Sequence, residues 1–330
     1  MVAFQMSQRR FLLIILIAVA LLLPALVTPF ILHVAIMVGL FAYLGSAWNL
    51  GCGYTGKLSW GHSAFMGLGA YVSTALYMFY AVTPWIGAIA GMIIAAAFGA
   101  LVGVICFRLG LKGHYFVIAT IALAEILRVA FINWSVVGGA WGLLMPVVPD
   151  SMYHFQFHSS RLGYYYIIFA MLVAILYVER RIIKSKLGYY FIAIKDDEEM
   201  AESLGINAFK YKVIAAAISA ALTAFGGTFY AQYVLYISPD TVMAVGVSTE
   251  ILMGAVVGGM ATLGGPVVGA AIIHPIMELS RAYVGGRGLD YVVAGLLTVG
   301  VAVLRPHGVI GWVEKAFDAL ASYLPRVARS

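Results

Sequence analysis

The chain of 330 residues is 63% hydrophobic and only 10% charged, with a formal net charge of +6 at pH 7. Its mean hydropathy of +0.98 and its several apolar runs of about 20 residues exceed what the core of a water-soluble protein requires. This composition excludes an ordinary soluble domain and indicates an integral membrane protein. Because spanning β-strands would show short segments of alternating hydropathy, the continuous runs predict membrane-spanning α-helices.

The first expected helix follows Arg9 and Arg10 and occupies the run FLLIILIAVALLLPALVTPFIL. A positive flank before an apolar run also resembles a secretory signal peptide. The run is long and further spans follow it, which favours an uncleaved first span.

Hydropathy along the chain predicts an all-α fold, a polytopic transmembrane helix bundle. The expected helices lie near residues 11–31, 32–50, 58–80, 85–107, 114–134, 163–179, 212–236, 248–263, 265–283 and 288–304. Gly and Pro interrupt 58–80, 248–263 and 265–283, so broken or re-entrant helices are an alternative there, and the bundle has about eight to ten helices. Small-xxx-small pairs such as Gly254/Gly258 and Gly265/Gly269 predict close helix packing.

Lys and Arg in short loops predict the orientation, because they favour the cytoplasmic side. Arg9 and Arg10 place the N-terminus there and leave only Arg161 and Arg287 outside. Most other cations fall on the cytoplasmic side, including Lys57, Lys112, the basic loop 180–212 and the tail 305–330. We therefore expect a single membrane domain over 1–304, a cytoplasmic C-terminal tail, and no nucleic-acid partner despite the basic composition.

The longest expected cytoplasmic loop contains the charged stretch KDDEEMAESLGIN at 195–207. Its acids suit the positive end of a helix dipole, and Gly205 is a helix stop, so a short amphipathic helix is predicted over 195–205. A glycine that ends a helix commonly adopts positive φ. Such a helix is either a solvated loop helix or a segment that docks into a cleft of a cytoplasmic protein.

A set of motifs spread over most of the chain resembles one group of permeases. EEMAESLG is similar to the E-A-A-x-x-x-G loop of ABC importer permeases, with Glu199, Ala201 and Gly205 in register and Met200 replacing the first Ala. The other motifs are GYTGKLSWGHSAFMGLGAYVSTAL, LKGHYFVIATIALAEILR, GGAWG, GGMATLGGPVVGA and RPHGVIG. Together they closely resemble the M-type permease subunit of branched-chain amino acid ABC importers. Val137 stands where that family commonly has Thr.

The resemblance implies a multi-pass protein of the bacterial inner membrane and a defined set of partners. These are a related H-type permease that completes a heterodimer, two cytoplasmic ATPases that use ATP and Mg, and a periplasmic binding protein. It also implies an ATPase-coupling role for Lys195, Asp196, Asp197, Glu198, Glu199, Ala201, Glu202, Leu204, Gly205, Ile206 and Asn207. Under this interpretation Ala201 and Leu204 enter the ATPase cleft, and Lys195 to Glu199 stay at the docking surface.

A nucleotide site of the chain's own is not expected. GCGYTGKL at 51–58 comes within one residue of the pattern G-x-x-x-x-G-K-[ST]. Leu58 lacks the hydroxyl that holds Mg²⁺, and the segment joins two spans instead of a soluble strand and helix. Cys52 and Cys106 lack metal-ligand spacing. We expect a transport subunit that is not an enzyme and binds no metal or cofactor.

Charges inside spans are the other candidates for function, since a charge in the bilayer usually faces a partner or a wet cavity. Glu125 with Arg128, and Glu278 with Arg281, have the i, i+3 spacing that places each pair on one helical face. Each pair fits either a structural ion pair or a substrate contact. Glu250 has no neighbour at such spacing and is expected to be a solvated terminus.

Candidates for the translocation path combine these charges with the glycine-rich start of the span at 58–80. His62 begins that span, where a lone His is more often a capping or packing residue. The path candidates are His62, Ser63, Gly67, Tyr71, Glu125, Arg128 and Glu250.

Three alternatives to a branched-chain amino acid importer stay open. Permeases of urea or short-amide importers share the same signatures. An ion-coupled secondary transporter needs membrane acids, and Glu125 and Glu278 are available, although each has an arginine three residues away. A membrane enzyme needs a nucleophile or a metal set, and none stands out.

Overall fold

The computed structural model describes residue 24 and residues 27–284, 288–305, 308–313 and 315–316. Most of the expected first span at 11–31 and most of the tail 305–330 lie outside the described residues. Everything below refers to the described part of the chain.

Within these residues the secondary structure is almost entirely helical, which confirms the all-α bundle. The helices are α2 (Pro29–Trp48), the π-helical η2 (Asn49–Gly53), α3 (His62–Tyr80), α4 (Pro84–Arg108), α5 (His114–Ile132), the 3-10 turns η3 (Ser135–Val137) and η4 (Gly139–Trp141), α6 (Leu162–Ile183), α7 (Lys186–Asp196), α8 (Glu198–Ser203), α9 (Ala208–Val234), α10 (Pro239–Val242), α11 (Val245–Gly258), α12 (Gly265–Val284) and α13 (Leu289–Leu304). One antiparallel pair, β1 (Leu143–Leu144) and β2 (Tyr236–Ile237), places Leu143 opposite Ile237.

A helix occupies every segment predicted after the first, although the ends differ. Among the described residues, six stretches are long and apolar enough to cross a membrane: 29–53, 84–108, 114–132, 162–183, 208–234 and 239–258. The stretch 239–258 is a broken helix, since α10 and α11 are separated at residues 243–244. With 14 residues, α11 is about 21 Å long, less than the roughly 30 Å of a hydrocarbon core. The break therefore precedes the segment 248–263 in which an interruption was expected, and α3 and α12, where breaks were also expected, are each continuous.

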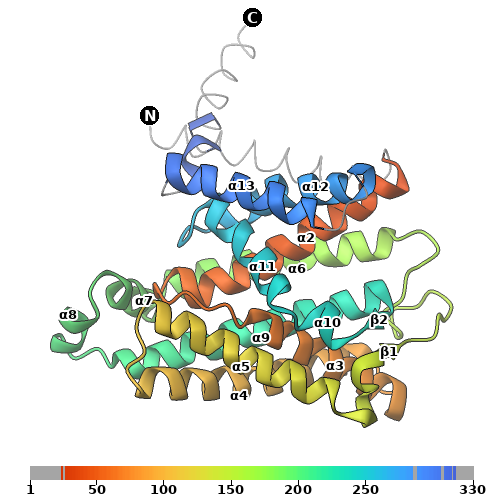
Figure 1. Ribbon diagram of the computed structural model, residues 1–330, viewed down its shortest axis with the longest axis horizontal. Helices are drawn as coiled ribbons and strands as arrows, with labels where there is room; N and C mark the ends of the chain where they lie inside the picture. Colours follow the sequence, from red (N-terminus) through yellow and green to blue (C-terminus); the bar gives the residue numbers. More distant parts are fainter. Residues whose placement is uncertain (1–23, 25–26, 285–287, 306–307, 314, 317–330) are drawn as a thin grey trace, which may run out of the picture.

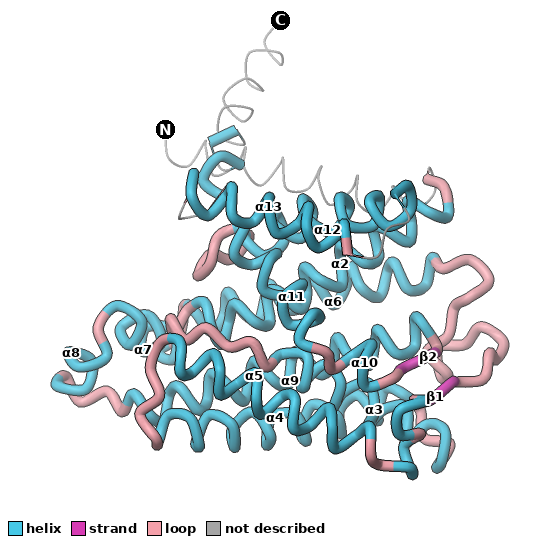
Figure 2. The backbone as a smooth tube through the Cα atoms, in the orientation of Figure 1, coloured by secondary structure: helices cyan, strands magenta, loops and turns pink. Residues whose placement is uncertain are grey.

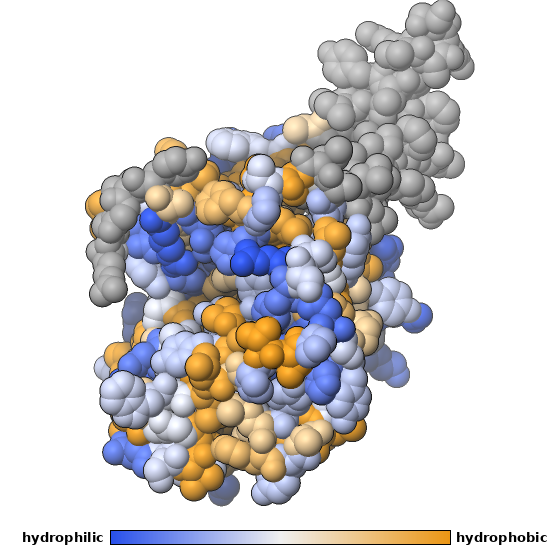
Figure 3. All heavy atoms as spheres, turned by 90° about the vertical axis from the view of Figure 1, so that its right-hand side faces the viewer, coloured by the Kyte–Doolittle hydropathy of each residue, from blue (hydrophilic) through white to orange (hydrophobic). Residues whose placement is uncertain are grey.

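The long helices lie side by side along the longest axis of the molecule (Figure 1). The short helices α7 and α8 lie at one end of this bundle, and β1 and β2 lie at the other, as the tube view also shows (Figure 2). Seen from the β1–β2 end, hydrophilic and hydrophobic side chains are mixed over the surface (Figure 3). This arrangement suits a bundle whose two ends meet water and whose length crosses a bilayer.

Small residues bring the helices close enough for backbone contact. A Cβ added to Gly69 of α3 would lie 1.9 Å from the carbonyl oxygen of Ala224 in α9, and one added to Gly269 of α12 would lie 1.8 Å from that of Gly254 in α11. No side chain fits at such distances. The close packing predicted from the glycine spacing at 254–269 is thus present, and α9 is held against α3 in the same way.

Candidate coupling site and polar cavity

The charged loop folds as two helices instead of the single helix predicted over 195–205. Asp197 has extended backbone angles (φ −156°, ψ 109°), and its side chain accepts a hydrogen bond from the backbone N–H of Met200. This N-cap satisfies a free donor of the first turn and starts α8 at Glu198. Lys195 and Asp196 consequently belong to the last turn of α7. The prediction placed the helix start too early because it counted the capping acid as part of the helix.

The end of α8 is closed by the glycine that the sequence singled out. Gly205 has φ +85°, which agrees with the positive φ expected there. The N–H of Gly205 donates to the carbonyl of Glu202 (2.9 Å), and that of Ile206 donates to the carbonyl of Ala201 (3.0 Å). These two bonds form a Schellman motif. Asn207 then caps α9, its side-chain oxygen accepting from the N–H of Lys210 (2.9 Å).

The outward surface of α8 differs from the predicted one. Ala201 is only 2% exposed and packs with Ile194 and Ala208, so it anchors α8 to the chain and does not face outward. Leu204 is 76% exposed, and Met200, four residues earlier on the same face, is 63% exposed. Met200 was noted only as a departure from the permease pattern, yet its i, i+4 spacing to Leu204 marks a shared apolar face.

Glu198 faces inward, contrary to its predicted place at a docking surface. Its carboxylate pairs with Lys57 (2.7 Å) from the loop before α3 and with Lys212 from the first turns of α9. Burial alone raises the pKa of Glu198, but the bonds from Lys212 and Lys57 outweigh it and hold the pKa below its ordinary value. Glu198 therefore connects α8 to two segments that sequence reasoning did not link to it.

Glu199 stays outside this connection. Its side chain is 90% exposed and reaches Lys112 only at 4.0 Å, a contact worth little in water. The contacts of Lys57, Lys112 and Lys212 with α8 place these cations at one end of the molecule, as the charge pattern predicted for a cytoplasmic side.

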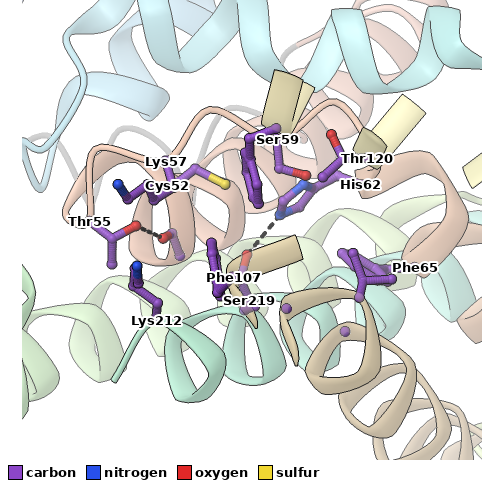
Figure 4. Close-up of a pocket in the computed structure, with 16 residues that line it drawn as sticks. Cys52, Thr55, Lys57, Ser59, His62, Phe65, Phe107, Thr120, Lys212 and Ser219 are labelled. Carbon is purple, nitrogen blue, oxygen red and sulfur yellow. Dashed lines mark hydrogen bonds between the residues drawn. The ribbon is translucent and has the colours of Figure 1, made fainter. Parts of the chain in front are cut away.

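A small cavity lies behind the two lysines (Figure 4). It has a volume of about 30 Å³, and Lys57 and Lys212 line one end of it while Ser59, His62 and Thr120 line the other. A space of this size holds a water molecule if polar partners are present.

His62 supplies such a partner. Its side chain is 2% exposed, and its Nε2 lies 2.8 Å from the Oγ of Ser219 in α9. Ser219 donates its only hydroxyl proton to the carbonyl of Ala47 (2.7 Å), so Nε2 of His62 must carry the proton and donate. The Nδ1 atom is then an acceptor, and it is buried without a partner among the described residues. An ordered water in the cavity would satisfy it.

The other path candidates on α3 do not line this cavity. The N–H of Ser63 donates to Ser248 in α11 (2.8 Å), and Gly67 lies against Met243, whose Cγ would be 2.1 Å from an added Cβ. Tyr71 is buried against Phe131 of α5. Ser63, Gly67 and Tyr71 are each four residues apart, so they lie on one face of α3. That face packs against α10, α11 and α5, whereas His62 faces α9.

Both predicted i, i+3 ion pairs are present, and each has further partners. Arg128 makes two bonds to Glu125 through its Nε (3.0 and 2.9 Å) and also pairs with Asp240 of α10. Arg281 pairs with Glu278 (3.2 Å). The additional acids come from other helices, which local spacing does not reveal.

The solvated helix end predicted at Glu250 is wrong. It is 7% exposed and not solvated, because Arg281 of α12 (2.9 Å) and the hydroxyl of Tyr291 in α13 (2.7 Å) bond to its carboxylate. Arg281 also pairs with Asp290 (2.6 Å). One guanidinium thus joins Glu250, Glu278 and Asp290, and with them α11, α12 and α13.

Two buried acids, Asp290 and Glu179, were not among the candidates from the sequence. Glu179, in the last turns of α6, is 0% exposed and accepts a hydrogen bond from the side-chain amide of Asn49 in η2 (2.9 Å). The same amide group bonds the loop after α11, at Thr262 and Ala261. The signal was available, since Glu179 precedes Arg180 and Arg181 at the end of a predicted span.

Comparison with known proteins also identifies the chain as similar to membrane permeases. Over residues 30–302 the sequence matches the family described as "Branched-chain amino acid transport system / permease component". It is 26% identical to the "High-affinity branched-chain amino acid transport system permease protein LivM" of Salmonella typhimurium, over 92% of this chain and 75% of that protein. The protein of the same name from Escherichia coli is 25% identical over the same shares.

A second kind of relative is "High-affinity branched-chain amino acid transport system permease protein LivH" of Salmonella typhimurium. It is 26% identical over 83% of this chain and 92% of its own length. No solved structure matches.

Proposed function

The chain belongs to the branched-chain amino acid transport system permease family, and from this premise we propose that it carries leucine, isoleucine and valine across the membrane as one permease subunit of an ABC importer. The observation that carries the proposal is the family match over 30–302, which covers nearly the whole described bundle. The relatives named LivM, matched over most of this chain, support the M-type assignment.

The energy for transport comes, in this proposal, from separate ATPase subunits that bind ATP and Mg. The segment that comes nearest to a P-loop, 51–58, is built as the end of a π-helix and a loop, and its lysine, Lys57, is bonded to Glu198. A P-loop lysine instead reaches the phosphates from a strand–loop–helix unit. This geometry supports a subunit that is not an enzyme and holds no nucleotide.

The ATPases are proposed to contact α8 at the exposed face of Met200 and Leu204. The ion pairs of Glu198 would carry their movement to the loop before α3 through Lys57 and to α9 through Lys212. In this scheme Gly205 fixes the angle between α8 and the segment that leads into α9.

The remaining partners follow from the two ends of the bundle. A periplasmic binding protein would meet the β1–β2 end, opposite α8, and a related H-type permease would complete the heterodimer, as the similarity to LivH suggests. We place the assembly in the bacterial inner membrane. An ion-coupled secondary transporter is less well supported, because Glu125 and Glu278 are both bonded to arginines.

Reconstitution in proteoliposomes tests the proposal. The chain, its partner permease, both ATPases and the binding protein are expected to give ATP-driven uptake of radiolabelled leucine, and omission of any one of them should abolish it. Excess isoleucine or valine should compete, and urea or acetamide should not. Leucine uptake by this subunit alone, driven by a proton or sodium gradient, would contradict the importer, and competition by urea would contradict the substrate.

A further inference from the structure

An apolar groove of about 450 Å³ lies along α6, where this helix meets α2, α4 and α9. Ala170, Ala174 and Val178 form part of its wall on α6. Its lining side chains carry two polar atoms, and both are occupied: the hydroxyl of Tyr43 donates to the carbonyl of Leu222 (2.9 Å), and the indole N–H of Trp85 donates to that of Met152 (2.7 Å). The groove therefore offers its occupant apolar contacts alone.

A second hollow, of about 470 Å³, lies at the end of α6 that leads into α7. It is lined by Tyr177, Arg180, Arg181, Lys184 and Ser185. The only side-chain hydrogen bond that these three cations make in the described structure is from Arg181 to the hydroxyl of Tyr177 (2.9 Å). Three exposed positive charges thus line this hollow without a carboxylate partner among the described residues.

The nearest acid in sequence does not neutralise them. Glu179 is buried on the other side of α6, where it bonds Asn49. The more buried cations Lys57 and Lys212 share Glu198, and Arg128, also largely buried, has Glu125. The cluster at 180–184 differs from the other exposed cations of the described chain because its three members line a single hollow.

The two hollows follow one another on the same face of α6. Ala174 and Val178 line the groove, and Arg181 and Ser185 line the cationic hollow. Ala174, Val178 and Arg181 are spaced at i, i+4 and i, i+3, which places them on one stripe of α6, and Ser185 follows just beyond the end of that helix. With 22 residues, α6 is about 33 Å long and crosses the hydrocarbon layer, so Arg181 lies at the depth of lipid headgroups.

We propose that this stripe of α6 binds an anionic glycerophospholipid. One acyl chain lies in the groove, and the phosphate lies among Arg180, Arg181 and Lys184, where the guanidinium groups can bond it in a bidentate way. Charge complementarity and the apolar groove together select this occupant: a free anion would leave the groove empty, and an apolar helix of a partner would leave the cations unpaired. The proposal depends on a membrane location and not on the transport activity.

Lipid binding to the purified full chain, delipidated in detergent, tests the proposal. Phosphatidylglycerol and phosphatidylcholine with identical acyl chains are titrated and the bound lipid is counted by native mass spectrometry. The variant Arg180→Gln/Arg181→Gln/Lys184→Gln is expected to bind phosphatidylglycerol about a hundredfold more weakly, since each of the three cations contributes roughly a fivefold factor. The matched control Arg108→Gln/Lys210→Gln/Lys315→Gln removes the same charge from three exposed cations that line neither hollow and should change binding by less than about twofold.

Two further arms separate a phospholipid from other ligands. Ala174→Trp fills the groove and should weaken phosphatidylglycerol binding even though every cation remains, and this arm holds if the triple variant does not fold. Glycerol phosphate, the headgroup chemistry without acyl chains, should compete poorly. Three results would overturn the proposal. The control triple could lose as much affinity as the site triple, or phosphatidylcholine could bind as tightly as phosphatidylglycerol. Full competition by glycerol phosphate would show that the site binds the anion alone.

Discussion

At the α8 end of the molecule one carboxylate, Glu198, is shared by two lysines, whereas between α11, α12 and α13 one guanidinium, Arg281, is shared by three carboxylates. Each central residue draws together segments that are distant in sequence. The α8 cluster attaches a six-residue helix at the end of the bundle, and the Arg281 cluster joins helices of the bundle itself. In both, loss of the central residue leaves like charges facing each other, and the cost rises with burial.

The largest effect is expected from Arg281→Met. This change leaves Glu250, Glu278 and Asp290 without their shared cation, and it should lower the free energy of unfolding by about 3 kcal/mol, the lower end of the range for buried pairs because Arg281 is 40% exposed. Thermal unfolding of the purified chain measures it. Arg161→Met, at an exposed helix start, is the matched control and should change stability little.

A rescue sharpens this prediction. The double variant Arg281→Met/Glu250→Gln also removes the charge of Glu250, which is more buried than Glu278. It should therefore recover part of the stability that Arg281→Met loses. No recovery in the double variant would mean that Arg281 acts through packing and not through charge.

The next effect is expected from Glu198→Gln, which leaves Lys57 and Lys212 facing each other. Loss of these charged hydrogen bonds should destabilise the local structure by about 2 kcal/mol, while the subunit still inserts. In the assembled importer, the variant should hydrolyse ATP with reduced uptake per ATP. Glu199→Gln, whose side chain is 90% exposed, is the control, and if it uncouples hydrolysis as strongly as Glu198→Gln, the inward ion pairs are not the connection.

A smaller effect is expected from Gly205→Val. An added Cβ meets no atom within 4 Å, so the cost is the positive φ alone, about 1–2 kcal/mol. The variant should remain paired with the partner permease but retain less ATPase on copurification. Gly205→Asn is the matched control, because Asn tolerates this backbone conformation. If the Val variant retains as much ATPase as the wild type, the Schellman turn has no part in ATPase coupling.

The smallest effect is a pH dependence at Glu198. Because Lys57 and Lys212 hold its pKa below the ordinary value of 4.5, its contribution to stability is complete above that value and is lost as the pH falls through the lowered pKa. The difference in unfolding free energy between the wild type and Glu198→Gln should therefore shrink on acidification below about pH 4.5. A difference that is constant down to pH 3 would show that the ion pairs contribute nothing measurable.

The sequence predicted what depends on short-range spacing. Helix positions followed from continuous apolar runs, and the pairs Glu125–Arg128 and Glu278–Arg281 followed from the i, i+3 interval. The positive φ of Gly205 followed from its place at a helix end. Each of these needs only the geometry of one helix.

Contacts between distant segments could not be predicted in this way. Glu198 meets Lys57 across 141 positions, and Glu250 meets Arg281 across 31, so a one-dimensional pattern contained neither the inward turn of Glu198 nor the burial of Glu250. Ala201 illustrates the same limit, since a small apolar residue fits equally a partner's cleft and the anchoring of α8 to its own chain. The cap at Asp197 is different, because an acid before a helical run is a readable start signal.

The length of α9 gives the α8 end an influence on the opposite end of the molecule. Only residues 204–207 separate α8 from α9, and the Schellman turn at Gly205 makes this connection stiff. With 27 residues, α9 is about 40 Å long, so a tilt of roughly 5° about its first turn displaces its last turn by roughly 3.5 Å. Directly beyond that last turn lies β2, which is hydrogen-bonded to β1. The strand pair therefore travels furthest when α9 tilts, although it lies at the far end of the bundle from α8.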